Sequence, residues 1–178
     1  AGQPGALQFR FSRRCGDRGA TPAETDAVER ALDGVRIPAA LRALWALTSG
    51  DDGAVAAPGS RPVGCLPGNR ALIPLDAVDA VAAEQRRRSG TAGWRPGWIP
   101  VISRGPADHG SGLFLDAETG RLGRWNGQDT RLDDDLPDTL GTYLEGIADT
   151  LEHPALATGD RPGPVECGTL VWASRRGD

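Results

Sequence analysis

The feature that most constrains the fold is a series of short apolar segments in the second half of the chain. Residues 98–102 are rich in apolar and β-branched side chains, and 113–116 and 121–125 repeat that character. Runs of this length are typical of strands, and the four-residue link AETG (117–120) is typical of a hairpin turn. The sequence therefore predicts an antiparallel meander, with RGPADHGSG (104–112) as a turn-rich connection between its first two strands.

Segments with helical periodicity surround this meander. The first runs over 21–33 and begins with Thr21, Pro22 and Glu24, residues that suit a capping box with proline in the first turn. Apolar residues recur every three or four positions in three further segments, 37–49, 76–88 and 138–152. Helices that flank an antiparallel sheet define the α+β class. We therefore expect an α+β fold in which an antiparallel β-sheet meander is flanked by about four helices.

The chain has a length suited to one domain with extensions. Its 178 residues match the usual size of a single domain. We place the domain at 21–153 and a C-terminal extension at 154–178, in which 169–172 resembles a strand. Residues 1–20 form an N-terminal extension, and the alternation around 9–11 suits an edge strand.

Composition narrows the classes of partner. The net charge is −4 and all 20 basic residues are arginine, a bias typical of a high-GC, actinobacterial genome. An acidic chain without a basic stripe is a poor direct ligand for nucleic acid. The three cysteines form no C-x-x-C pair, which favours a reduced, cytoplasmic chain. No apolar run reaches the roughly 20 residues of a membrane span, and the N-terminal sequence lacks the pattern of a signal peptide.

A search for reactive groups gives few candidates. His153 suits a helix C-terminus, and no nucleophile, phosphate-binding or calcium-loop motif occurs. Asp108, His109 and Asp116 could share a pocket if the meander brought them into one cleft. The sequence therefore gives no catalytic assignment and implies no metal or cofactor, and we lean against an enzyme.

Tryptophans and acidic residues supply the candidates for partner binding. Trp45 lies in the apolar stripe of a helix and Trp98 begins a strand, so both are expected in the core. We expect Trp94, in a Pro-Gly segment, to be half-exposed, and Trp94 and Trp125 to be candidate interface anchors. The acidic candidates for the same surface are Asp51, Asp52, Asp133, Asp134 and Asp135.

Four motifs in order resemble the SUKH superfamily, which includes fungal regulators of cell-wall synthesis and killer-toxin resistance. The resemblance covers about residues 21–152. It departs from the family pattern at 109–112, where the chain between Asp108 and Leu113 is longer than usual. The motifs are Ile37-Pro38 with a helix closed by SGDDG (49–53), LIPL (72–75), WIPV (98–101) with Asp108 and LFLD (113–116), and GRLGRW (120–125) with TLGTYL (139–144).

The resemblance implies an α+β fold and a binding role rather than catalysis. Bacterial members of the family are thought to be immunity proteins that neutralise toxins, often nucleases, and fungal members act through protein contacts. We therefore expect a non-catalytic protein-binding domain, foremost an immunity protein whose partner is a toxin. Two alternatives stay open: a regulatory or adaptor scaffold, and a small-molecule-binding protein or enzyme recruited onto this fold in a biosynthetic pathway.

Overall fold

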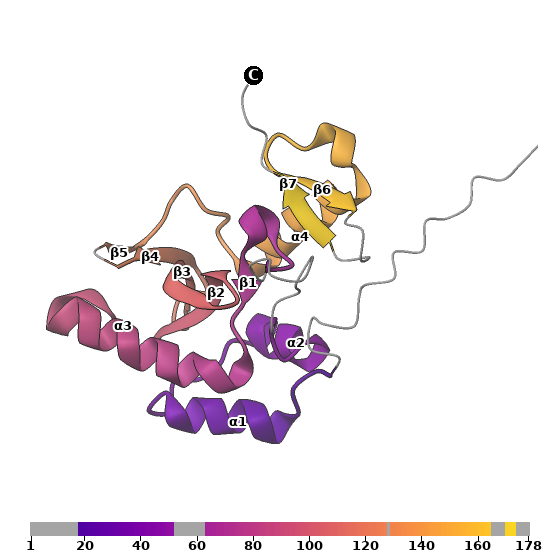
Figure 1. Ribbon diagram of the computed structural model, residues 1–178. Helices are drawn as coiled ribbons and strands as arrows, with labels where there is room; N and C mark the ends of the chain where they lie inside the picture. The colour runs from indigo at the N-terminus through magenta and orange to yellow at the C-terminus, as the bar shows by residue number, and fades with distance from the viewer. Residues whose placement is uncertain (1–17, 52–62, 128, 165–169, 174–178) are drawn as a thin grey trace, which may run out of the picture.

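The computed structural model describes residues 18–51, 63–127, 129–164 and 170–173 (Figure 1). Four α-helices lie in these ranges: α1 (Pro22–Ala31), α2 (Ala39–Leu47), α3 (Val78–Gly93) and α4 (Leu140–Glu152). The strands are β1 (Ala71–Leu72), β2 (Trp98–Gly105), β3 (Asp108–Asp116), β4 (Leu122–Asn126), β5 (Thr130–Leu132), β6 (Arg161–Pro164) and β7 (Leu170–Ala173). Short 3-10 turns are η1 (Pro67–Asn69), η2 (Leu75–Ala77) and η3 (Pro154–Leu156).

The central sheet is an antiparallel meander in the order β1-β2-β3-β4-β5, so the predicted α+β class is confirmed. Its register pairs Trp98 with Asp116 and Phe114 with Gly123. The expectation of a long turn over 104–112 is wrong, because β2 and β3 continue through it until Gly105 pairs with Asp108. Irregularities along β2 shift the pairing and let the strands run on into this long hairpin.

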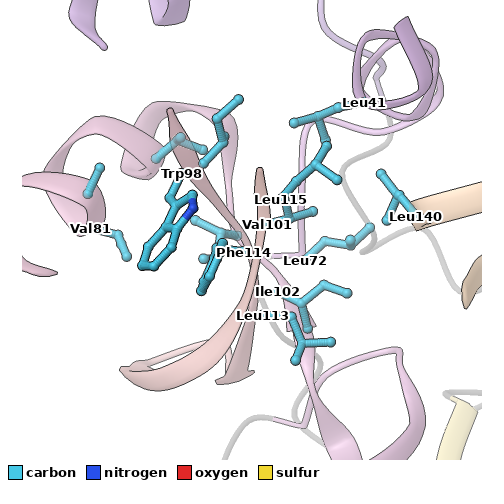
Figure 2. Packing of buried hydrophobic residues seen from close by; sticks show 14 of the residues in the cluster. Leu41, Leu72, Val81, Trp98, Val101, Ile102, Leu113, Phe114, Leu115 and Leu140 are labelled. Atoms are coloured by element: carbon cyan, nitrogen blue, oxygen red, sulfur yellow. The ribbon is translucent and has the colours of Figure 1, made fainter. Parts of the chain in front are cut away.

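The sheet separates two groups of helices. On one face Phe114 points toward Val81 of α3, and on the other Leu115 points to the side that holds Leu41 of α2 and Leu140 of α4 (Figure 2). Helix α1 packs against α2 and α3. The alternation of side chains along each strand therefore supplies both layers of the core.

An aromatic cluster fills the layer between the sheet and α3. Trp98 stacks on Phe114 with ring centroids 4.2 Å apart. Trp94 meets Trp98, Phe114 and Trp125 edge-to-face at 5.9, 5.4 and 5.7 Å. The indole N–H groups of Trp94 and Trp98 have no hydrogen-bond acceptor among the described residues, and edge-to-face packing against π systems offsets part of that cost.

The burial of these rings corrects two expectations. Trp94 is only 6% exposed, so the prediction that it is half-exposed is wrong, and Trp125 is 1% exposed. Helix α3 continues to Gly93, past the predicted end at 88. Trp94 follows as its C-cap residue, which places the indole ring in the cluster. In this conformation neither indole offers area to a partner, whereas Trp45 and Trp98 are core residues as expected.

Two glycines make room for the rings. A Cβ atom at Gly112 would lie 2.6 Å from Trp125, and one at Gly123 would overlap Phe114 and lie 2.6 Å from the carbonyl oxygen of Arg131. Both positions face α3 in the strand register, so glycine there is a packing requirement.

The C-terminal hairpin of β6 and β7 forms a separate two-stranded sheet that packs on η1 and α4 (Figure 1). Trp172 is buried and its Nε1 donates to the carbonyl of Cys65 at 2.9 Å. At the other end of the described chain, the amide of Ala20 donates to the carbonyl of Trp45. The proposed edge strand around 9–11 lies outside the described residues.

Replacing Gly123 with alanine tests the packing requirement. The added methyl group must displace the Phe114 ring or the β5 backbone, so Gly123→Ala should lower the free energy of unfolding by about 1–3 kcal/mol. The control is Gly146→Ala in α4, where a Cβ meets nothing within 4 Å. That change should raise stability by about 0.5–1 kcal/mol, because alanine favours the helix. Equal stability of the two variants in urea unfolding would refute the cluster as a packing constraint.

Candidate functional site

The three residues of the predicted pocket do not meet. Asp108 and His109 begin β3 and Asp116 ends it, so the two carboxylates lie roughly 25 Å apart along an extended strand. Asp116 is buried and its Oδ1 accepts from the amide of Glu118 at 2.9 Å. It therefore closes the β3–β4 turn, and the hypothesis of a carboxylate pair in one cleft is wrong.

Two of the predicted acidic contacts are internal. Asp51 is 2% exposed, and its carboxylate accepts a hydrogen bond from the amide of Cys65 at 2.7 Å. This bond links the loop after α2 to the segment before η1. Asp133 is 5% exposed, forms an ion pair with Arg124 and accepts from the amide of Asp135 at 3.2 Å. Both carboxylates organise loops, which corrects their assignment to a binding surface.

The remaining acidic candidates differ in exposure and pairing. Asp134 is exposed and forms an ion pair with Arg121 at 2.5 Å, so an arginine of the same chain already offsets its charge. Asp135 is exposed, and no ion pair joins it to a described residue. Asp52 lies outside the described residues.

Helix α4 carries a row of exposed carboxylates. Glu145, Asp149 and Glu152 are exposed, and their spacing places them within about 60° around the helix axis. Asp135 and Asp138 extend the charge before the first turn. We call these five residues the acidic face of α4. No ion pair to a described cation involves any of them.

This arrangement opposes the stability of the helix. Carboxylates near a helix C-terminus meet the negative end of the macrodipole, and like charges three or four positions apart repel. Asp149 and Glu152 lie in the last turn, where the helix has no basic residue. Asp149 and Glu152 are therefore retained against a local electrostatic cost.

The side of α4 that faces the core carries apolar side chains. Tyr143, Leu144 and Ile147 are only partly buried where they pack on the core. Burial raises the pKa of the Tyr143 phenol, and the neighbouring Arg70 opposes part of that shift.

The distribution of charge along the sequence contains a signal for this surface that no single motif carries. Residues 133–160 hold eight of the 24 acidic residues and none of the 20 arginines. The segment therefore carries a charge of −8 while the rest of the chain carries +4, which together give the net −4. Such asymmetry is an indicator of an interaction surface.

A groove of about 540 Å³ lies on the other side of the sheet, between α3 and the tip of the β2–β3 hairpin. Two of the predicted pocket residues, Asp108 and His109, line one wall. The opposite wall is the face of α3 that carries Ala80, Glu84 and Arg88. No tryptophan lines this groove.

Comparison with known proteins does not assign the chain to a group. No protein-family model matches it, and a search of curated proteins finds no match. Among the described residues, no group of three or more His, Cys, Asp or Glu side chains could hold a metal ion. None of the described helices combines the length and apolar character needed to cross a bilayer.

Neutralising the end of the acidic face should stabilise the protein. The double variant Asp149→Asn/Glu152→Gln removes two charges from the unfavourable end of the dipole, so Tm should rise by about 1–3 °C at low ionic strength. The gain should vanish in high salt, because screening removes the dipole effect. Thermal unfolding followed by circular dichroism measures it, and a lower Tm at low salt would contradict the account.

Proposed function

We propose that this protein is a non-catalytic binding domain that neutralises a basic partner protein, foremost a toxin domain, by direct contact through the acidic face of α4. The observation that carries the proposal is the row of exposed, unpaired carboxylates Glu145, Asp149 and Glu152, kept where they weaken their own helix. Charge retained at a cost to stability is typical of surfaces selected for binding.

The resemblance to the SUKH superfamily supports the immunity role. The motifs that carry it serve the fold: Trp98 and Phe114 stack in the core, and Asp51 and Asp116 hold loops. The motif TLGTYL (139–144) covers the first half of α4, whereas Glu145, Asp149 and Glu152 lie beyond it. Fold alone does not determine function, so the proposal rests on the charge of α4 and not on the resemblance.

Electrostatic complementarity supplies the mechanism. The three carboxylates on one side of α4, together with the charges of Asp135 and Asp138 before it, attract a basic surface at long range and raise the rate of encounter. On contact, the partly exposed Leu144, which lies about 80° around the helix from Glu152, gives apolar area at the edge of the charges. A partner whose active site is itself basic, as in nucleases, would be occluded by this contact.

The kinetic test uses the triple variant Glu145→Gln/Asp149→Asn/Glu152→Gln. Wild-type protein serves as bait for affinity purification from the source organism, and the captured protein is then purified. Stopped-flow measurements of association should show an on-rate about tenfold lower for the variant at low salt, with a shallower dependence on ionic strength. The captured protein should be toxic alone and inactive in the complex.

The matched control is Asp76→Asn/Asp79→Asn/Glu118→Gln, which removes three exposed carboxylates from other elements and changes the net charge equally. Its on-rate should stay near the wild-type value. If both triple variants slow association to the same degree, net charge and not α4 is responsible. A captured partner without toxic activity would favour the adaptor alternative, and neighbouring genes give an independent check on it.

A further inference from the structure

The groove between α3 and the β2–β3 hairpin has the composition of a ligand site independent of the acidic face. Its volume of about 540 Å³ lies within the range of small-molecule sites. Helix α3 covers the opposite face of the sheet from α4, so occupation of the groove does not require the proposed protein contact (Figure 1). Small apolar side chains form part of its lining: Ala77, Ala80, Val81 and Ala107.

The hairpin wall is held rigidly. The carbonyl oxygen of His109 accepts from Nε2 of Gln85 at 3.3 Å and from Nε1 of Trp125 at 3.2 Å. Gln85 is 2% exposed, so α3 and β4 both fix the hairpin backbone from the interior. The Nε2 atom of His109 is buried without a hydrogen-bond partner among the described residues. A fixed backbone with unused hydrogen-bonding capacity is a feature of preformed sites.

Each wall carries charged side chains, and no ion pair links the described residues of the two walls. On the hairpin, Asp108 is exposed, and its Oδ1 accepts from the amide of Gly110 at 3.0 Å. On α3, Nε of Arg88 donates to Oε1 of Glu84 at 2.5 Å, while Arg87 occupies the other carboxylate oxygen. Glu84 is thereby satisfied, and the two Arg pairings lower its pKa.

The terminal nitrogens of Arg88 therefore remain as donors at one wall, and the second carboxylate oxygen of Asp108 remains as an acceptor at the other. No ion pair joins these two described residues. We propose that the groove binds a small zwitterion of the amino-acid or short-peptide class, with its carboxylate at Arg88 and its ammonium group at Asp108. An apolar side chain of the ligand would lie on the alanine and valine surface.

The test uses the dipeptide alanyl-leucine as the probe with isotope-labelled protein. Amide chemical shifts of His109, Gly110 and Gln85 should move on titration, with a Kd of about 0.1–1 mM, the range that a ligand of this size reaches. N-acetyl-alanyl-leucine lacks the ammonium group and alanyl-leucine amide lacks the carboxylate. Each should bind about tenfold more weakly, because each loses one charge-assisted contact.

Two variants test which charged end of the ligand binds to which wall of the groove. Arg88→Gln should weaken alanyl-leucine about tenfold but leave the amide unaffected, and Asp108→Asn should weaken alanyl-leucine but leave the acetylated peptide unaffected. Arg87→Gln is the matched control, because Arg87 shares the Glu84 ion pair but does not line the groove. Free leucine as a second probe distinguishes amino acid from peptide, and binding of either zwitterion supports the site.

Shifts confined to other elements, or no shift with either zwitterion well above this concentration range, would overturn the proposal. Equal binding of the charged and blocked peptides would do the same. Both side chains are exposed, so the variants should keep the wild-type spectrum away from the groove. The toxin-neutralising proposal is untouched by any of these results, since it depends on α4.

Discussion

The packing of four aromatic rings between the sheet and α3 is the constraint on which the rest of the structure depends. Trp94, Trp98, Phe114 and Trp125 come from the end of α3 and from three successive strands. Their mutual contacts fix the distance of α3 from the sheet and require glycine opposite two of the rings. The same cluster places Nε1 of Trp125 against the hairpin backbone and so shapes the groove on that side.

Ion pairs within the chain offset the charge of several surface carboxylates. Arginines of β4 and β5 neutralise nearby aspartates, as in the pairs Arg124–Asp133 and Arg131–Asp129. Similar local pairing occurs on α1, where Arg42 of α2 forms ion pairs with Asp26 and Glu29. Helix α4 differs in that three exposed carboxylates lie within about 60° around its axis and none of them forms an ion pair with a described residue. A region that keeps uncompensated charge is the natural candidate for contact with another molecule.

The fold class and the helices could be predicted because interactions between residues close in sequence determine them. The capping box of Thr21 and Glu24 forms as predicted, because both groups lie within one turn. The extension of β2 and β3 could not be read from RGPADHGSG, because its glycines and proline suit a turn until Gln85 and Trp125 anchor the backbone. Long-range contacts also buried Trp94, which local sequence places in a loop. The sequence therefore indicated that Asp108 and His109 could share a pocket. The residues of α3 that form the opposite wall of the groove depend on tertiary packing.

The proposed binding surface lies on α4, whereas the tryptophans are buried in the core. Hydrogen–deuterium exchange of the complex with the captured partner measures this directly, since amides at a buried interface exchange more slowly. The account predicts added protection over 133–152, with exchange in 94–125 unchanged. Protection confined to 94–125, with α4 exchanging as in the free protein, would contradict it.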